Sequence, residues 1–280
     1  MDKTLYQKKI HEEILDIMDV VDRVCRKNRI HYYLISGTLL GAIRHGGFIP
    51  WDDDLDIVMP REDFNRFLDI CKDQLPVGYK LNWITTDPEY WRIYAKISNT
   101  QTVFLEQGAQ RNCGIFVDVF PIDDTNGYSR FVELRKQIIK KLVVMISGKR
   151  SPESFSGLKK YIVKFLTYKA LFKIANFIMT MTNGNNRKYY SNFGSQYPIK
   201  RRTIEKEAFG NGCDIKFENR IYIAPDKSEA VLKNIFGNNY MELPPVEKRK
   251  THYPAYVRFS DGTEALFADE KTKLSISDIL

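Results

Sequence analysis

Residues 51–59 read Trp-Asp-Asp-Asp-Leu-Asp-Ile-Val-Met, so four carboxylates occupy five positions directly before an apolar run. If residues 55–59 form a strand, side chains alternate between its faces, and Asp54 and Asp56 point the same way. Leu55 and Ile57 then enter the core. Neighbouring carboxylates raise one another's pKa, and a divalent cation removes that penalty. The stretch therefore predicts a strand that carries a metal-binding pair, and its hard oxygen ligands suit Mg²⁺ or Mn²⁺.

A small-residue turn precedes the acidic stretch. Residues 30–35 are apolar and rich in strand-forming side chains, Ser36-Gly37-Thr38 follow, and residues 39–44 have the apolar spacing of a helix. An isolated Ser-Gly-Thr is usually an ordinary turn. Between a strand and a helix, however, the backbone N–H groups and the helix dipole make a site for anions. Because the acidic strand follows after one short loop, we expect a phosphate cradle beside the metal site.

A third carboxylate interrupts another predicted strand. Residues 114–120 read Gly-Ile-Phe-Val-Asp-Val-Phe, with Asp118 at the centre of the hydrophobic run. A buried carboxylate costs several kcal/mol unless it is paired or bound to a metal. We therefore favour a ligand role for Asp118 over a structural hydrogen-bonding role. Asp123 and Asp124 follow Pro121 and are expected to mark a turn.

Three segments together resemble the LicD/fukutin-type phosphotransferases, a branch of the nucleotidyltransferase superfamily. The longest segment is residues 36–57, from Ser-Gly-Thr-Leu-Leu-Gly to Asp-Asp-Asp-Leu-Asp-Ile. Residues 116–121, Phe-Val-Asp-Val-Phe-Pro, look like the family's third-carboxylate strand, and residues 236–252 resemble its C-terminal signature. The resemblance covers residues 1–124 and 220–253 and leaves the middle of the chain unassigned.

The resemblance implies a role for each matching residue. It makes Asp54, Asp56 and Asp118 the catalytic and metal-binding carboxylates. The substrate-binding residues that it implies are Asp52 as a supporting group, Ser36, Gly37 and Thr38 around phosphate, Arg44 as a neutralising charge, Lys96 as a nearby cation, and Tyr240, Arg249 and His252 in the C-terminal signature.

The chain departs from the family pattern at two points. Ser98 stands where the family often has a second cation after Lys96, and Tyr253 follows His252 where paired histidines are usual. A role that needs both imidazole rings is therefore in doubt. For Tyr240, Arg249 and His252, a lid, an acceptor contact and a structural role all stay open.

The reaction that the resemblance implies is metal-dependent transfer of a phospho-alcohol group from a nucleotide diphosphate donor to a hydroxyl. Family members commonly attack the distal phosphorus of CDP-choline, release CMP and add phosphocholine to a surface or lipid-linked glycan. Asp118 is the expected proton acceptor. Two alternatives stay open, a nucleotidyltransferase that attacks the phosphorus nearest the nucleoside and a non-catalytic nucleotide-binding module.

The order of apolar patterns predicts an α/β to α+β fold with a mixed sheet flanked by helices. Helices are expected over residues 10–25 and 62–74, Pro60 ends the acidic strand, and strands are expected at 79–83, 91–97, 102–105 and 115–120. The N-terminus lacks the apolar pattern of a signal peptide, and no apolar run is long enough to span a bilayer. Four scattered cysteines are typical of reduced thiols, so we expect a cytoplasmic protein.

The middle of the chain differs sharply in charge. Residues 130–188 contain 14 Lys and Arg but only Glu133 and Glu153, a local charge of +12 in a chain whose total is +8. The segment predicts either a helical subdomain with a solvated basic face or a surface for anionic phospholipid at the inner face of a membrane. Nucleic acid is disfavoured because the signatures of RNA modules are missing. We expect a catalytic core at residues 1–129, a basic helical insertion at 130–190, and a C-terminal part at 191–280 that completes the cleft.

Overall fold

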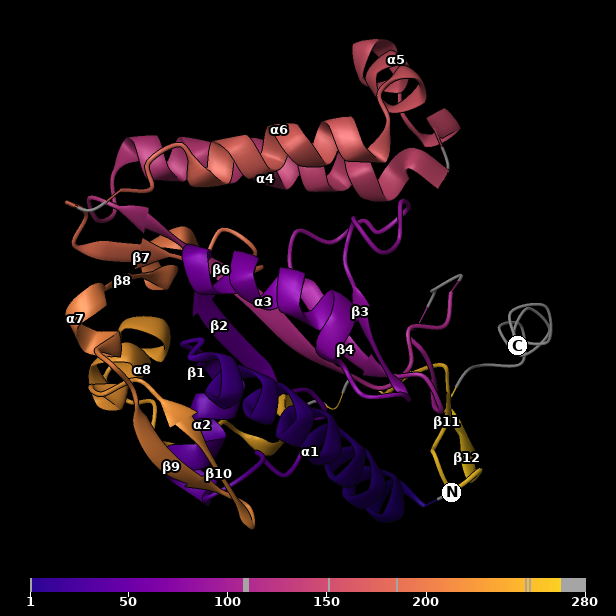
Figure 1. The fold of residues 1–280 in the computed structure, drawn as a ribbon, viewed down its shortest axis with the longest axis vertical. Helices are drawn as coiled ribbons and strands as arrows, with labels where there is room; N and C mark the ends of the chain where they lie inside the picture. The colour runs from indigo at the N-terminus through magenta and orange to yellow at the C-terminus, as the bar shows by residue number, and fades with distance from the viewer. Residues whose placement is uncertain are drawn as a thin grey trace.

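A mixed β-sheet forms around the acidic stretch and organises the chain (Figure 1). The computed structural model describes residues 2–107, 111–150, 152–184, 186–249, 251 and 253–267. In the main sheet the strands run in the order β1-β2-β6-β4-β3, while β7 pairs with β6 and β8 pairs with β7. Strands β2 and β6 are parallel, and the other pairings are antiparallel. The predicted fold class, a mixed sheet flanked by helices, is confirmed.

The main sheet contains β1 (Tyr33–Leu34), β2 (Asp56–Pro60), β3 (Tyr79–Asn82), β4 (Ala95–Asn99), β6 (Phe116–Thr125), β7 (Tyr189–Ser191) and β8 (Thr203–Glu205). A hairpin is formed by β9 (Cys213–Phe217) and β10 (Arg220–Ala224), and a small sheet by β5 (Val103–Leu105), β11 (Tyr256–Arg258) and β12 (Glu264–Leu266). The α-helices are α1 (Lys3–Asn28), α2 (Ser36–His45), α3 (Arg61–Gln74), α4 (Arg130–Ser147), α5 (Gly157–Phe165), α6 (Tyr168–Thr180), α7 (Lys206–Phe209) and α8 (Ser228–Phe236). The 3-10 turns are η1 (Gly148–Arg150), η2 (Pro152–Ser154), η3 (Ile199–Arg202) and η4 (Val246–Lys248).

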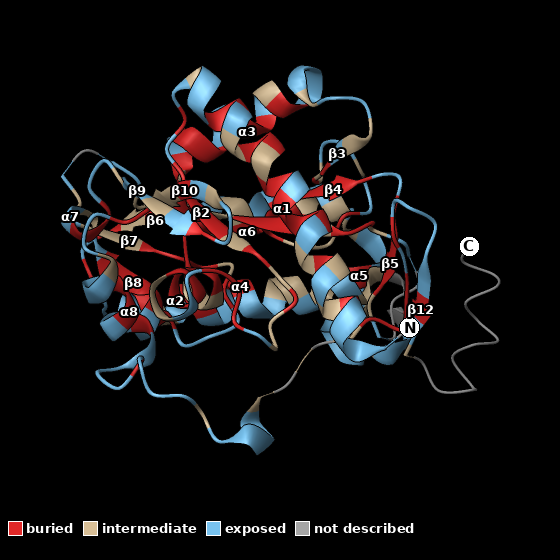
Figure 2. Cartoon of the chain, turned by 90° about the horizontal axis from the view of Figure 1, so that it is seen from below, coloured by how far each residue is buried: buried red, intermediate tan, exposed pale blue. Residues whose placement is uncertain are grey.

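Helices cover both faces of the main sheet. In Figure 2, α3 lies on one side of the strands, and α2 and α8 lie on the other. The long helix α1 packs against β4, β6 and α3. Its apolar positions Ile10, Ile14, Ile17 and Val21 are all buried, as their spacing predicts. The core therefore lies between the sheet and helices that follow the expected pattern.

Strand β6 is longer than the sequence predicts. It continues through Pro121, so the expectation that Asp123 and Asp124 mark a turn is wrong. On one side of β6, pairing with β4 reaches Val119, and pairing with β7 begins at Asp123. Pro121 lies between these two partners, where the lack of an N–H breaks neither ladder.

Strand β5 also differs from the expectation that residues 102–105 complete the main sheet. It pairs instead with β11, which comes about 150 residues later in the chain. The edges of β4 are already occupied by β3 on one side and β6 on the other. The main sheet therefore offers β5 no place beside its neighbour in sequence.

The basic segment is helical, as its sequence predicts. Helices α4 and α6 lie side by side along one edge of the molecule, and α5 projects from their end (Figure 1). The buried Arg135 of α4 donates from all three nitrogens to Ile178 O, Met179 O and Thr182 Oγ1, at 2.6–2.9 Å. A cation at the C-terminal end of a helix satisfies its last carbonyl groups. None of the helices in the described ranges is long and apolar enough to cross a membrane.

A buried ion pair joins this helical segment to the sheet. Arg61, the first residue of α3, donates through Nε and Nη2 to both carboxylate oxygens of Asp123 on β6, at 2.8 and 2.7 Å. Its Nη1 also contacts Asn176 Oδ1 of α6 at 3.3 Å, and Asn183 Nδ2 donates to Asp123 at 3.0 Å. Asp123 is completely buried, so its charge depends on these partners.

We predict that Asp123→Ala lowers the free energy of unfolding by about 3–5 kcal/mol, because it leaves the Arg61 charge buried without its partner. Urea denaturation measures the change. Asp124→Ala is the matched control, since Asp124 is partly exposed and its ion pair with Lys206 is worth about 1 kcal/mol or less. Equal losses in the two variants contradict the assignment.

Candidate active site

Three charged side chains form a row across the centre of the main sheet. The Cα of Asp118 on β6 pairs with Asp56 on β2 and with Lys96 on β4. Directly paired residues on adjacent strands project to the same face of a sheet. Asp118 and Lys96 are buried, and Asp56 is half-buried. The two carboxylates that the sequence assigns to separate strands are therefore brought together.

Asp54 lies just before β2 and completes the acidic group. Asp54 and Asp56 are half-buried, while Leu55 and Ile57 are buried, so the predicted alternation of faces is confirmed. The pKa of Asp56 is raised well above its usual value by burial and by the charges of Asp54 and Asp118. Asp52 adds to this rise. These carboxylates therefore lie close enough to compete for protons.

The pKa of Asp52 is also raised by its neighbours. Burial, the charges of Asp54 and Asp53, and a side-chain hydrogen bond to Asp54 raise the pKa of Asp52 to about 8. A hydrogen bond between two carboxyl groups requires that one of them carry a proton. A proton shared by Asp52 and Asp54 and a cation bound beside them would relieve the same repulsion.

Helix α1 holds the acidic loop in place. The Tyr6 hydroxyl donates to Asp53 Oδ2 at 3.1 Å in the buried interior. The backbone carbonyl of Asp52 accepts from Gln7 Nε2 and lies 2.7 Å from His11 Nε2, whose ring stacks on Phe48 at 3.9 Å. Asp53 is therefore turned toward α1, and the other acidic residues of the stretch remain for the site.

The small-residue turn begins α2, contacts the acidic group through Gly37 and Thr38, and binds a cation through Ser36. The Ser36 hydroxyl accepts from Arg202 Nη1 at 2.7 Å, and Thr38 Oγ1 accepts from the backbone N–H of Asp56 at 2.9 Å. A Cβ added to Gly37 would stand 2.6 Å from Asp52 Oδ2, so any larger residue here would displace the Asp52 carboxylate. The helix starts at Ser36, three residues earlier than its apolar spacing indicates. The structure thus brings Ser36, Gly37 and Thr38 next to the carboxylates.

Asp118 has cationic neighbours but an unsatisfied oxygen. Lys96 Nζ lies 3.5 Å from Asp118 Oδ1 and 3.2 Å from Glu106 Oε1, above the Phe116 ring. Even so, Asp118 Oδ1 is buried and has no hydrogen-bond partner among the described residues. Burial raises the pKa of Asp118, although Lys96 and Arg92 oppose the rise. Lys96, predicted to bind substrate, is positioned to balance this carboxylate.

The donor set fits a hard divalent cation. Buried polar atoms almost always form hydrogen bonds in folded proteins, so Asp118 Oδ1, which has only its ion pair with Lys96, leaves room for a further ligand beside two other carboxylates. Within the described ranges, however, no three carboxylate, imidazole or thiolate groups form a ready ligand cage. Repulsion between like charges keeps such side chains apart, and a cation reverses that preference. Asp54, Asp56 and Asp118 therefore fit an ion that draws them together on binding.

The C-terminal signature packs beside the acidic stretch. Arg44 Nη1 donates to the carbonyl oxygens of Tyr240 and Glu242, at 3.1 Å each. The Arg249 guanidinium lies over the Trp51 ring at 4.9 Å. Arg44 thus holds Tyr240 at the end of α2, Arg249 packs on Trp51 at the start of the acidic stretch, and their substrate contacts stay predictions. His252 lies outside the described residues.

Sequence reasoning missed two groups at the site. Arg92 forms an ion pair with both carboxylate oxygens of Glu106, at 2.8 and 2.6 Å. Glu106 in turn contacts Lys96. Arg202, from η3, reaches Ser36 and opposes the rise in the Asp56 pKa. Neither residue lies in a recognisable motif, although Arg202 ends the basic run Lys200-Arg201-Arg202. Only the fold brings these residues to the carboxylates.

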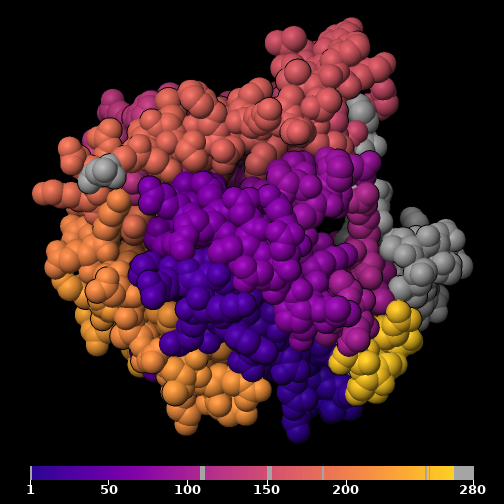
Figure 3. All heavy atoms as spheres, in the orientation of Figure 1, coloured from indigo at the N-terminus to yellow at the C-terminus, as the bar shows by residue number. Residues whose placement is uncertain are grey.

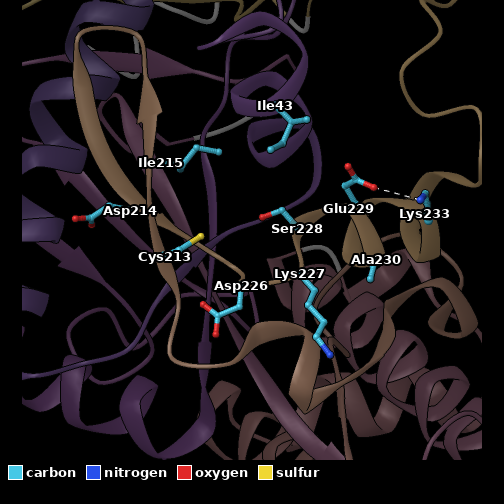
Figure 4. Close-up of a pocket in the computed structure, with 10 residues that line it drawn as sticks. All are labelled: Ile43, Cys213, Asp214, Ile215, Asp226, Lys227, Ser228, Glu229, Ala230 and Lys233. Atoms are coloured by element: carbon cyan, nitrogen blue, oxygen red, sulfur yellow. Dashed lines mark hydrogen bonds and ion pairs between the residues drawn. The ribbon is translucent and has the colours of Figure 1, made fainter.

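A pocket of about 540 Å³ lies elsewhere, between α2, β9 and the start of α8 (Figure 4). Its polar side chains are already used, since Asp214 pairs with Arg26 and Glu229 pairs with Lys233. The pocket includes none of the predicted site residues. The acidic row, not this pocket, is therefore the candidate active site.

One family model and several curated proteins are similar to this chain. Residues 29–142 match the family model described as LicD/FKTN/FKRP, nucleotidyltransferase domain. The lipopolysaccharide cholinephosphotransferase LicD of Haemophilus influenzae is 29% identical over 258 residues, which cover 85% of this chain and 92% of that protein. Uncharacterized proteins of Rickettsia typhi and Rickettsia prowazekii are 43% and 40% identical over 68 and 70 residues, 22% and 26% of their lengths and 24% and 25% of this chain. Residues 29–142 are therefore similar to the LicD nucleotidyltransferase domain, and the similarity to that cholinephosphotransferase over 85% of the chain supports an enzyme of the transferase class.

Proposed function

We propose that this chain transfers phosphocholine, or a related phospho-alcohol group, from a CDP-linked donor such as CDP-choline to a hydroxyl of a cell-surface or lipid-linked glycan. The observation that carries the proposal is the match to a lipopolysaccharide cholinephosphotransferase, because it spans 85% of the chain. The acidic row beside the start of α2 supports it, since phosphoryl transfer depends mainly on positioning and charge neutralisation.

The described residues divide the work of such a transfer. The acceptor oxygen attacks the distal phosphorus of the donor, the bond from that phosphorus to the bridging oxygen breaks, and CMP leaves. Asp118 accepts the hydroxyl proton, because its Oδ1 is buried, has no hydrogen-bond partner among the described residues, and belongs to a carboxyl with a raised pKa. The first turn of α2 holds phosphate oxygens with its backbone N–H groups.

We propose Mg²⁺ or Mn²⁺ as the cofactor, held by Asp54, Asp56 and Asp118. A bound ion supplies Lewis-acid stabilisation of charge on phosphate oxygens. Lys96 forms an ion pair with Asp118, and Glu106, itself paired with Arg92, holds Lys96 in position. Asp52 then supports Asp54 through their hydrogen bond.

We predict that Asp54→Asn and Asp56→Asn each reduce transfer by about 100-fold or more, because each removes a charge from the group that stabilises the reacting phosphate. The variants stay folded, and their melting temperatures equal or exceed that of the wild type, since each substitution relieves repulsion between carboxylates. Release of CMP from CDP-choline in the presence of a glycan acceptor measures the transfer.

Asp69→Asn is the matched control, because Asp69 is an exposed residue of α3 that pairs only with its neighbour Lys72 among the described contacts. Its turnover is expected to equal that of the wild type. Wild-type turnover in purified Asp56→Asn protein overturns the catalytic assignment.

Donor identity is tested by a thermal-shift panel. We predict that CDP-choline raises the melting temperature more than CDP-ribitol, CDP-glycerol or UDP-sugars, and that the shift requires Mg²⁺ or Mn²⁺. A ligand that binds only the folded state stabilises it by about 2.7 kcal/mol at 100 times its dissociation constant. If the melting temperature rises with another donor only, that donor and not CDP-choline is the substrate. If no nucleotide raises it, a non-catalytic module is favoured.

A second function has one observation in its favour, because the matched domain is described as a nucleotidyltransferase domain. In that reaction the acceptor attacks the phosphorus nearest the nucleoside and becomes nucleotide-labelled. Product analysis separates the two functions. Free CMP with a phosphocholine-labelled glycan supports the first, and a nucleotide-labelled acceptor supports the second.

We also propose that the helical segment contacts a membrane that carries the acceptor. Nine of the twenty exposed large hydrophobic side chains in the described ranges lie on α4, α5 and α6, and a tenth, Met181, directly follows α6. They include positions i, i+3 and i+7, which share one helical face: Phe131, Leu134 and Ile138 on α4, Leu158, Tyr161 and Phe165 on α5, and Ile174 and Phe177 on α6 with Met181 at its end. Figure 3 shows α5 and α6 as an outer layer of the molecule.

The positive charge of these helices favours anionic phospholipid. Exposed cations of the same helices include Lys140, Lys141, Lys159, Lys164, Lys169 and Lys173. The exposed Glu153 is already paired with Lys160. Each basic residue near an anionic leaflet contributes about 1 kcal/mol, and apolar side chains that enter the interface add to this attraction. An anionic phospholipid surface therefore fits these helices better than an uncharged one.

We predict that the protein sediments with vesicles containing anionic phospholipid at low salt, and that Phe165→Ser with Phe177→Ser weakens this binding about 10-fold. High salt weakens it further, because exposed charges are screened. Ile221→Ser is the control, since Ile221 is 59% exposed on β10, away from the helical segment. Equal loss in the control, or no binding to anionic vesicles, rejects membrane contact.

A further inference from the structure

One buried arginine is left incompletely bonded at the start of α2. Arg202 is 4% exposed, and its Nε has no hydrogen-bond partner among the described residues. Its Nη1 donates to Ser36 Oγ at 2.7 Å, and its guanidinium lies over the Tyr197 ring at 4.6 Å. The side chain therefore reaches the turn that opens α2, and the ring of Tyr197 covers one face of the guanidinium.

Two other buried arginines provide the comparison within the same molecule. Arg61 donates from Nε, Nη1 and Nη2 to Asp123 and Asn176, and Arg135 donates from all three nitrogens to acceptors of α6 and its end. Both are structural, and both are fully bonded. Arg202 differs because its Nε–H is buried without an acceptor, which a purely structural arginine avoids.

The surroundings of Arg202 favour an anionic acceptor. The N-cap residue of α2 is Ile35, whose side chain cannot accept a hydrogen bond, and the first turn holds no acidic residue. The N–H groups of that turn therefore have no side-chain cap from this position. Ser36 and Gly37 are half-buried, so a ligand can reach them. A guanidinium fork and a helix N-terminus both match phosphate oxygens.

We propose that Arg202 is a donor-binding residue whose Nε–H edge binds a phosphate oxygen of a nucleoside diphosphate ester at the start of α2. This inference rests on the proposed function, and it adds a cation that the LicD-like motifs of the chain do not contain. Ser36 binds Nη1 and the Tyr197 ring covers one face of the guanidinium, so the plane of the group is set before the donor arrives. The acceptor then completes the hydrogen bonding of the buried side chain.

The test compares binding in Arg202→Gln, Arg202→Lys and Arg201→Gln. Arg201 is the matched control, because it is the adjacent residue of η3 and is exposed. The probes are CDP-choline, inorganic pyrophosphate and cytidine, measured by calorimetry and thermal shift. We expect Arg202→Gln to weaken CDP-choline and pyrophosphate about 10- to 100-fold and to leave cytidine unchanged, whereas Arg201→Gln matches the wild type. Arg202→Lys lies between them, since lysine keeps the charge and loses the fork.

The outcomes separate this inference from the proposed function. If Arg202→Gln lowers the melting temperature but binds both diphosphates like Arg201→Gln, Arg202 is a structural bridge and the inference is overturned, while the proposed function stands. If the wild type binds pyrophosphate through Arg202 but not CDP-choline, the inference holds and the choline donor is wrong. If Arg202→Gln does not fold, an Arg202→Lys protein with wild-type affinity for pyrophosphate overturns the inference. If the wild type binds neither diphosphate, the inference also fails.

Discussion

The central constraint on this structure is that it holds several mutually repelling carboxylates close together at one end of β2. Asp54 and Asp118 raise the pKa of Asp56, Asp54 raises the pKa of Asp118, and Asp52 shares a hydrogen bond with Asp54. Their nearest compensating cations are Lys96, set beside Asp118, and Arg202, at the start of α2. Repulsion between these carboxylates lowers the stability of the fold. A divalent cation that binds between them removes this repulsion, and this gain in free energy strengthens its binding.

Elements far apart in the sequence hold this acidic group in place. Helix α1 supplies Tyr6, Gln7 and His11 to the acidic loop, β4 supplies Lys96, and η3 supplies Arg202. The C-terminal signature then packs on Trp51 and Arg44. Asp56 and Asp118 are therefore held by paired strands, and segments from both ends of the chain contact the acidic stretch and its neighbours.

The sequence predicted a residue's role where side chains alternate along a strand or where a charged residue interrupts an apolar run. Alternation placed Asp54 and Asp56 on one side of the chain, and an isolated charge in an apolar run identified Asp118. The roles of Arg202 and Glu106 could not be predicted, because their contacts join positions that only the fold brings together. The path of β6 through Pro121 was also hidden, since it depends on where β4 ends and β7 begins. Local patterns thus predicted the carboxylates, and long-range pairing decided their surroundings.

The central claim is that Asp56 and Asp118 share a divalent cation with a donor diphosphate. A crystal structure with CDP-choline and Mn²⁺, using anomalous scattering to locate the metal, tests it most directly. The account predicts a manganese peak about 2.0–2.2 Å from carboxylate oxygens of both residues, with the diphosphate against the first turn of α2. A bound nucleotide with manganese elsewhere, for instance beside Asp214 and Asp226 in the pocket of Figure 4, contradicts it.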